Sequence, residues 1–424
     1  MASPVNPPRG MRDFLPVDKA RRERVLAVIR SVFTAHGFDE IETPVMEDSS
    51  RLHAGLGGDN EKLAYAVLKR GLTAEDFATA TDALDLTDLG LRFDLTVPLT
   101  RFYATHRAEL PAVFRVIQAA PVWRAERPQK GRYRQFVQCD IDIIGEAGPL
   151  AEIELLTATV DTFAALGLTG CTLRINDRRL LIGMLEIFGF AAESHEQVLI
   201  TIDKLDKVGP EGVVAELRER GLDAAAVEAL DAFFRRPQAL EQPSFGERAI
   251  RTALPTGADD AVVAQLAGIG QAVAGGHIEF DPFLVRGMGY YTGTIFEIAH
   301  PDLPYSLGGG GRYDGMIGRF LGVDVPAAGF SIGFERIVDL VRLRDDESAG
   351  GVALVYDSDV TSATLMRLKA ELIASGRRVK LERAPRNLKP LLAQLAASGF
   401  TEMATVSIGA ATVADLRMRK LAAG

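Results

Sequence analysis

The chain has 424 residues, a formal net charge of −9 and 47% hydrophobic residues. This composition excludes a wholly disordered or collagen-like chain, and at about 150 residues per domain the length predicts two to four domains. No uninterrupted run of about 20 apolar residues is present, so we expect no membrane partner. The first residues, Met1 to Pro4, lack the pattern of a secretory signal, and the chain has two cysteines. We therefore expect a cytoplasmic protein in a reducing compartment.

The N-terminal region mixes helix and strand patterns. Apolar residues recur at helical spacing over 19–36 and predict an amphipathic helix, after which a short strand is stopped by Pro44. A second helix is predicted over 97–107, with Pro98 near its first turn. Strands are expected at 91–96, 113–123 and 133–144, and a polar hairpin over 124–131 joins the last two.

The middle of the chain changes character. Over 178–275, leucine, alanine and glutamate dominate with helical periodicity, which predicts a helical insertion of roughly 100 residues. Strand patterns return at 277–283, 294–298 and 330–332. Beyond the linker-like sequence at 348–351, apolar strands and helices alternate, which is typical of a small α/β domain.

Three common nucleotide-binding or acyl-transfer motifs are absent. The sequence has no Gly-x-x-x-x-Gly-Lys-Ser/Thr loop, no Gly-x-Gly-x-x-Gly turn between a strand and a helix, and no Gly-x-Ser-x-Gly elbow. The six histidines are scattered, and none stands at ligand spacing with a cysteine, so we expect no metal site. The phosphates of a bound nucleotide would therefore be held by side chains, which directs attention to the arginines.

A basic hairpin spans residues 124–134, which carry five positive charges against one negative in a chain that is acidic overall. A solvated surface loop is the commoner interpretation of such a hairpin taken alone. Here the flanking apolar strands would place Arg124 and Arg134 at strand ends over a sheet. Because the guanidinium group is a planar fork that matches phosphate oxygens, arginines on rigid strands indicate a phosphate clamp.

Three further segments combine glycine with arginine. Arg286 opens a Gly-Met-Gly-Tyr-Tyr stretch, four glycines precede Arg312, and Gly329 to Arg336 runs from a strand into a helix. A flexible connection is the plain interpretation of a glycine run. Because these glycines lie between strand-like segments, we interpret them instead as places where the backbone approaches a ligand closely.

Together, and in this order, these segments resemble class II aminoacyl-tRNA synthetases, specifically the histidyl-tRNA synthetase family. The resemblance begins at Arg9–Pro16 and extends into the C-terminal region. The segment with Pro44 resembles the family's first motif, Arg124–Asp142 the second and Gly329–Arg336 the third. Arg286–Tyr291 and Gly308–Gly315 resemble the two motifs peculiar to the histidine enzymes.

The resemblance implies an α+β fold, in which a six-stranded antiparallel sheet is flanked by helices. It implies a catalytic domain in two parts, residues 1–177 and 276–345, separated by the helical insertion at 178–275. Residues 350–424 would form a small, short α/β domain that resembles an anticodon-binding domain. The first motif lies at the dimer interface in this family, so the resemblance also implies a homodimer.

The implied reaction has two steps. The carboxylate of L-histidine attacks the α-phosphate of ATP, giving histidyl-adenylate and pyrophosphate, and the adenylate then esterifies the 3′ end of histidine tRNA. ATP would arrive with Mg²⁺ as a substrate complex, and no tightly bound cofactor is implied.

The resemblance implies roles for individual residues. The catalytic residues would be Arg286 and Arg124, which neutralise charge on the α-phosphate. Histidine would be bound by Asp94, Leu95, Thr96, Arg124, Gln138, Asp142, Arg286, Tyr290 and Tyr291. ATP would be bound by Arg124, Glu126, Arg132 and Arg336, and tRNA would be contacted by Arg127, Gln129 and Lys130. Among these, Asp142 and Tyr291 would face the imidazole ring.

Two departures from the family's pattern bear on activity. The family's Arg-Gly-Leu-Asp-Tyr-Tyr motif has Gly289 here in place of the acidic residue. The section from Ala404 to Leu416 is shorter than the family's strand-loop-strand, which bears on anticodon recognition.

Two other functions stay open. One is the histidine-binding regulatory subunit of ATP phosphoribosyltransferase, a paralogue that does not charge tRNA. The presence of Arg124, Arg286 and Arg336 weighs against it, because that paralogue loses catalytic arginines. The other is an amino-acid-activating paralogue that does not act on tRNA. Gly289 and the short C-terminal section support this alternative.

Overall fold

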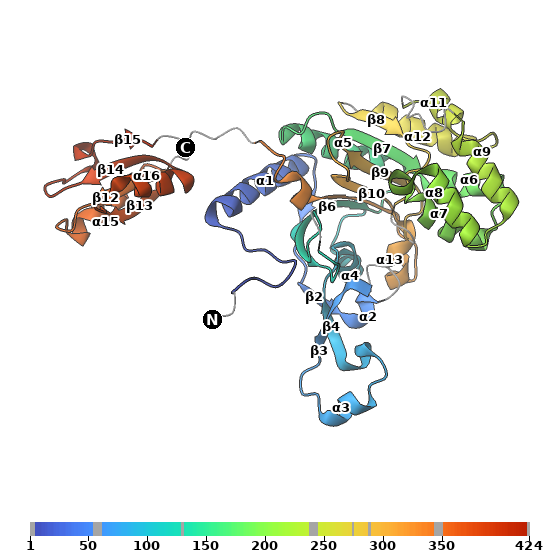
Figure 1. Cartoon of the computed structure of the whole chain (residues 1–424), viewed down its shortest axis with the longest axis horizontal. Coiled ribbons are helices and arrows are strands. Elements are labelled where there is room, and N and C mark those ends of the chain that lie inside the picture. The colour runs from blue at the N-terminus through green and yellow to red at the C-terminus, as the bar shows by residue number, and fades with distance from the viewer. Residues whose placement is uncertain are drawn as a thin grey trace. The chain divides into compact units, whose positions relative to one another are not determined.

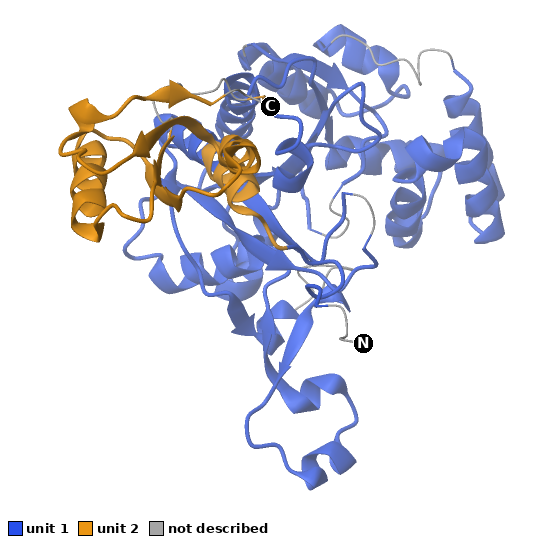
Figure 2. Cartoon of the chain, turned by 60° about the vertical axis from the view of Figure 1, so that its left-hand side comes forward, with its two compact units in different colours: residues 1–12, 25–341 blue, residues 13–24, 342–424 orange. Residues whose placement is uncertain are grey.

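A computed structural model describes residues 5–53, 62–128, 131–236, 245–273, 275–286, 290–342 and 351–421. Its contacts divide the chain into two compact units, residues 1–12 with 25–341 and residues 13–24 with 342–424 (Figure 2). Within the described ranges, no helix is both long and apolar enough to span a membrane. Gln129, Lys130 and Gly289, which the sequence singled out, lie outside the described residues.

An eight-stranded sheet forms the centre of the larger unit (Figure 1). In spatial order its strands are β1 (Asp39–Glu40), β5 (Phe114–Trp123), β6 (Gln135–Ile144), β11 (Ala327–Ile332), β10 (Gly308–Arg312), β9 (Thr294–Ala299), β7 (Thr172–Asp177) and β8 (His277–Phe280). The strands from β5 to β7 pair antiparallel. The expected α+β class is confirmed, and the sheet exceeds the expected six strands because β1 and β8 each add a parallel strand at an edge.

Strand β6 has two different faces, because successive side chains point to opposite sides of a sheet. Ile141 and Ile143 are fully buried in the core on one side. Gln138, Asp140 and Asp142 alternate with them and form a polar row on the other side. Since slipping by one residue would exchange the two faces, the buried apolar residues hold the polar row in one register.

The four-glycine run is strand β10, in the middle of the sheet between β9 and β11. An added Cβ would lie 2.8 Å from the Phe330 Cα at Gly310, and 2.7 Å from the Arg286 Nη1 at Gly309. At Gly311 it would lie 3.0 Å from a ring carbon of Tyr291. The run is therefore a strand whose neighbouring protein groups leave no room for side chains, and the expected close approach of a ligand to these glycines stays a prediction.

The strand predicted at 91–96 ends earlier than expected. Strand β4 (Thr87–Leu91) pairs with β2 (Met46–Asp48) and β3 (Tyr65–Leu68) in a separate three-stranded sheet. The chain then turns, because the Arg92 guanidinium is buried and donates to the carbonyl oxygens of Thr43 at 2.8 Å and Pro121 at 3.0 Å. Helix α4 (Thr96–His106) begins directly after this turn.

Helices occupy much of the described part of 178–275. They are α6 (Arg178–Phe188), α7 (His195–Ile202), α8 (Leu205–Glu219), α9 (Ala224–Phe234), α11 (Glu247–Ala253) and α12 (Asp260–Ala272). The Asp177 side chain caps α6 by accepting a hydrogen bond from the Arg179 backbone, and the helix ends at Gly189 with a φ of 93°. Phe233 packs on Phe283 with ring centroids 5.8 Å apart, which ties these helices to the segment that returns to the sheet.

The remaining α-helices in the described part of the first 342 residues include the N-terminal one predicted at 19–36. They are α1 (Pro16–Ala35), α2 (Ser49–Leu52), α3 (Ala74–Thr79), α5 (Leu150–Ala165), α13 (Asp314–Leu321) and α14 (Phe334–Ile337). Ile29 and Phe33 of α1 and Leu155 of α5 are fully buried. Helix α3 lies at the tip of an arm that projects with β3 and β4 away from the main sheet (Figure 1).

The C-terminal part of the chain has its own four-stranded sheet, in the order β13 (Val379–Arg383), β12 (Gly351–Tyr356), β14 (Phe400–Val406) and β15 (Arg419–Lys420). Strand β12 is parallel to both of its neighbours, and β15 is antiparallel to β14. Helices α15 (Ser362–Ala374) and α16 (Leu388–Ala397) contribute to two apolar clusters. One contains Val352 and Leu368, and the other Val355 and Leu395, so both faces of β12 are buried.

Candidate active site

A cavity of about 1130 Å³ lies on the face of the main sheet that carries the polar row of β6. Of the residues that the sequence predicted for the site, the following line it: Asp94, Thr96, Arg124, Glu126, Arg127, Arg132, Gln138, Asp142, Arg286, Tyr290, Tyr291 and Arg336. Leu95 does not, because its side chain is fully buried in the core. The fold thus brings together residues that lie more than 200 positions apart in the sequence.

Asp142 is a buried carboxyl group in this cavity. It accepts a hydrogen bond from the Tyr313 hydroxyl at 2.6 Å. Burial, and to a lesser extent the charge of Asp94, raise the pKa of Asp142 to about 7 against the lowering effect of that bond. Opposite Asp142 lies Gly329, where an added Cβ would be 2.8 Å from the carboxyl carbon. Glycine at this position makes room for the carboxyl group.

The turn at residues 94–96 forms one wall of the cavity. The Asp94 side chain accepts a hydrogen bond from the Val97 backbone at 3.2 Å, which holds it at the start of α4. Gln118 of β5 donates to the Leu95 carbonyl oxygen at 3.0 Å. These two bonds fix the turn, so Leu95 contributes its backbone to the geometry of the wall.

Arginines enter the cavity from three separate segments. Arg124 donates to the Phe93 carbonyl oxygen at 2.9 Å. Arg286 pairs with Glu297 and donates to the Ser306 hydroxyl at 3.3 Å. Arg336 donates to the Ser306 carbonyl oxygen at 2.6 Å. Ser306 therefore links two arginines that face one cavity.

The positive charges in the cavity are crowded. Burial, followed by the charges of Arg286 and Arg132, lowers the pKa of Arg336. Arg132 itself lies 3.5 Å from the Glu126 carboxylate and keeps about half of its side chain exposed. Because like charges repel in a partly buried site, this part of the cavity favours a ligand with several negative charges.

Two tyrosines complete the cavity. The rings of Tyr290 and Tyr291 pack against each other with centroids 4.3 Å apart. Burial raises the pKa of both hydroxyls above the ordinary value. The two hydroxyls also hydrogen-bond to each other, and both stay protonated near neutral pH, so they are polar groups that a ligand can contact.

Sequence reasoning missed several residues of the site. Asp140, Ser306, Tyr313 and Ser331 line the cavity, and so do Glu196, Ile200 and Asp203 from the helical insertion. Asp140 had a usable signal, because Gln138, Asp140 and Asp142 alternate along a predicted strand and must share a face. The insertion residues had no local signal, since their place depends on how α7 packs.

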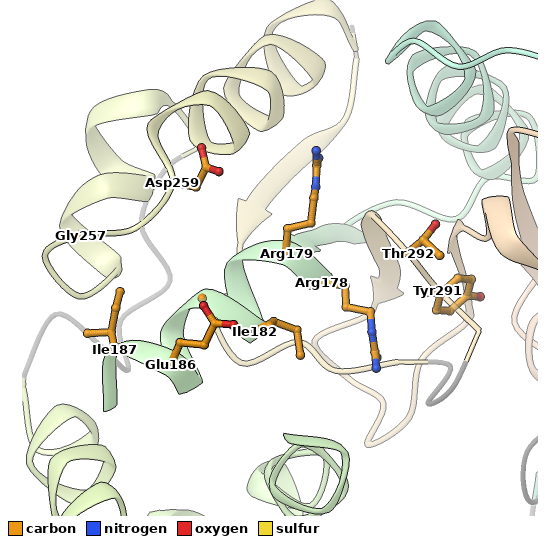
Figure 3. Close-up of a pocket in the computed structure, with 10 residues that line it drawn as sticks. Arg178, Arg179, Ile182, Glu186, Ile187, Gly257, Asp259, Tyr291 and Thr292 are labelled. Carbon is orange, nitrogen blue, oxygen red and sulfur yellow. The ribbon is translucent and has the colours of Figure 1, made fainter. Parts of the chain in front are cut away.

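A second groove, of about 910 Å³, borders the first at Tyr291 (Figure 3). It lies between α6 and the start of α12, and Arg178 and Arg179 point in opposite directions from α6. Arg179 pairs with Asp177 at 2.8 Å, and burial lowers the pKa of Arg178. Tyr291 is the one predicted site residue that reaches this groove. In the described ranges, no three His, Cys, Asp or Glu side chains gather so that they could hold a metal ion.

Sequence comparison relates this chain to known proteins. The family model described as histidyl-tRNA synthetase matches residues 10–337. The histidine–tRNA ligase of Leifsonia xyli subsp. xyli is 59% identical, over 98% of this chain and 99% of that protein. The histidine–tRNA ligase of Christiangramia forsetii is 36% identical, over 80% of this chain and 76% of that protein.

Two solved structures share the fold. Histidyl-tRNA synthetase from Nostoc sp. PCC 7120 superposes with a TM-score of 0.78 at 24% identity, covering 99% of this chain and 95% of that one. An ATP phosphoribosyltransferase regulatory subunit/histidyl-tRNA synthetase from Bacillus halodurans C gives a TM-score of 0.77 at 19% identity, covering 97% and 100%. At these identities the two structures show the fold alone.

Proposed function

This chain belongs to the histidyl-tRNA synthetase family, and from that premise we propose that its cavity activates L-histidine with ATP and passes the product to tRNA. It is a ligase, and histidine, ATP and histidine tRNA are its substrates. One observation supports the assignment of this activity to the cavity. Polar groups that can accept hydrogen bonds from an amino acid, and arginines that can bind phosphates, line the same face of one sheet.

For the first step, we assign charge neutralisation to Arg124 and Arg286. An oxygen of the histidine carboxylate forms a bond to the α-phosphorus of ATP, and the bond to the departing pyrophosphate breaks. Negative charge grows on the phosphate oxygens, so fixed guanidinium groups stabilise the transition state more than the ground state. Hydrogen bonds to the Phe93 carbonyl and to Ser306 hold the two groups in place before reaction.

For ATP, we assign Glu126 to the adenine side, Arg132 to the outer phosphates and Arg336 to the opposite side of the nucleotide. The crowding that lowers the pKa of Arg336 supports this, because a polyphosphate would relieve the repulsion among the cations. Mg²⁺ would accompany ATP as part of the substrate and offset further phosphate charge.

For histidine, we assign Asp142 and Tyr291 to the imidazole ring, with Tyr290 beside them. The Asp142 carboxyl accepts the ring N–H, and the Tyr291 hydroxyl donates to the other ring nitrogen. An apolar amino acid would leave these buried groups unpaired, so the pocket rejects it. Asp94, Thr96 and Gln138 are assigned to the α-amino group.

For the second step, we assign the tRNA contacts to the hairpin with Arg127, Gln129 and Lys130 and to the short C-terminal domain at 350–424. Arg127 opens onto the cavity, which supports a place for it near the acceptor end. Basic side chains at this edge would contact backbone phosphates and give salt-dependent affinity.

We also propose a homodimer that works in the cytoplasm. The segment after Pro44 and the small sheet support the dimer, because Val45, Met46 of β2 and Leu89 of β4 are exposed apolar side chains. Clustered apolar exposure of this kind is typical of an interaction surface. A symmetric pair of chains would cover it.

Histidine-dependent exchange of pyrophosphate into ATP, followed by charging of purified tRNA, tests the proposal. We expect both activities. A protein that binds histidine but performs no exchange would fit the regulatory-subunit alternative. Exchange without charging of any tRNA would fit the paralogue that activates amino acids for another acceptor.

A further inference from the structure

The cavity contains a buried carboxyl group for which the proposed function has no task. Asp140 stands between Gln138 and Asp142 in the polar row of β6 and is 5% exposed. In the strand register it lies directly opposite Ser331 of β11. Burial, and next the charge of Asp142, raise the pKa of Asp140 well above its ordinary value. Placing a second buried carboxyl group beside Asp142 is costly, which indicates that Asp140 has a role of its own.

Asp140 binds the side-chain amide of Gln138. The Gln138 Nε2 donates to the two carboxyl oxygens of Asp140 at 3.2 Å and 3.4 Å, and to the Ser331 hydroxyl at 3.2 Å. The Ser331 hydroxyl also hydrogen-bonds to Asp140. The three side chains form a closed cluster that engages the nitrogen end of the amide.

This cluster fixes the orientation of the Gln138 side-chain amide. The amide nitrogen faces Asp140 and Ser331, whose oxygens accept its hydrogen bonds, so the amide oxygen points away from both groups. In this orientation the Gln138 Oε1 is buried, and no group in the described part of the chain donates to it. A buried acceptor without a donor is unfavourable, and Gln138 lines the cavity, so a donor from the substrate would complete it.

We propose that Asp140 is a positioning residue that holds the Gln138 amide so that Oε1 accepts a hydrogen bond from the α-ammonium group of histidine. The inference rests on the proposed function, which places that group beside Gln138. Asp140 acts through Gln138 and does not touch the substrate. It thereby adds selectivity for a ligand with an α-amino group, because a ligand without one leaves Oε1 unpaired.

Comparing the binding of two ligands distinguishes this positioning role from general damage to the pocket. L-histidine and imidazolepropionate share the ring and the carboxylate, but the second lacks the α-amino group. With the full-length protein in calorimetry, Asp140→Ala should raise the Kd for L-histidine about tenfold, the scale for one lost hydrogen bond to a charged group. The Kd for imidazolepropionate should change by less than about twofold, since that ligand makes no such bond.

Conservative variants and a control sharpen the test. Asp140→Asn keeps an oxygen that can accept from Gln138 and should restore most of the affinity for L-histidine. Ser331→Ala removes the other group that accepts from the Gln138 amide. It should cause a smaller loss of L-histidine affinity, again without a matching loss for imidazolepropionate. If Asp140→Ala does not fold, Ser331→Ala tests the inference in its place. Cys139→Ala changes a buried side chain on the opposite face of the same strand, so the ratio of the two affinities should stay unchanged.

The outcomes distinguish the inference from its premise. If the unmodified protein binds both ligands equally, the α-ammonium contact of the proposed function is wrong. The inference about Asp140 is then overturned as well. If the unmodified protein prefers L-histidine and Asp140→Ala keeps that preference, or weakens both ligands equally, the inference alone is overturned.

Discussion

A substitution at Gly309 tests whether the position of the Arg286 guanidinium, and not merely its presence, supports adenylate formation. An added Cβ would lie 2.7 Å from the Arg286 Nη1 and 2.8 Å from its Nε, whereas ordinary contacts begin near 3.4 Å. The three atoms nearest to that Cβ all belong to this flexible side chain. Gly309→Ala should therefore leave the fold intact and displace the guanidinium by about 1 Å, a shift that can cost roughly 100-fold in rate.

The assay is histidine-dependent ATP–pyrophosphate exchange. Gly309→Ala should lower the exchange rate by about 100-fold, as should Arg286→Ala, because each removes one charge-stabilising group from its place. If Gly309→Ala acts through Arg286, the double variant should be no worse than Arg286→Ala alone. Gly315→Ala is the matched control: an added Cβ there meets nothing within 4 Å, and exchange should stay normal. Fully additive losses, or near-normal exchange by Gly309→Ala, would refute the reasoning.

Three further predictions follow from the structure. Burial raises the pKa of Asp142 to about 7 from 3.8, so between these values the native state holds a proton that the unfolded chain has lost, and the free energy of unfolding falls as pH rises. Asp142→Asn should lessen that fall in urea unfolding at different pH values; an unchanged pH dependence would contradict the burial argument. Deleting residues 350–424 should leave exchange within a few-fold but lower tRNA charging far more, since the proposed second RNA contact would be lost, and unimpaired charging would exclude that contact. Light scattering should report a dimer of 45.8 kDa chains, and a monomer at micromolar concentration would disprove the proposed interface.

Local sequence patterns predicted much of the fold. The strand expected at 113–123 is Phe114–Trp123, and the helix expected at 97–107 is Thr96–His106. Strand β10 had no such pattern, because glycines carry no side chain whose alternation can be seen. The strand at 91–96 was misplaced because Arg92 turns inward to satisfy backbone carbonyls of two other segments, which local sequence does not reveal.

In the candidate site too, some residues could be predicted from the sequence and others could not. Arg124, Asp142 and Arg286 stand in recognisable motifs, and the structure places all three around one cavity. Glu297 and Ser306 hold Arg286, yet each is an ordinary residue whose partner is fixed only by the folded sheet. Asp203 reaches the cavity from a helical insertion, so only the tertiary packing of that insertion identifies it.

The pairing of β6 with β11 has a consequence for the chain while it is being made. Residues 139–144 meet residues 327–332, so the growing chain must emerge from the ribosome for nearly two hundred more residues before the inner edge of β6 is covered. At about 5–20 residues per second this leaves an open strand edge for roughly ten seconds or more, long enough for wrong pairing between neighbouring chains. Truncated products that end inside the helical insertion would keep that edge permanently and should be the aggregation-prone species during synthesis.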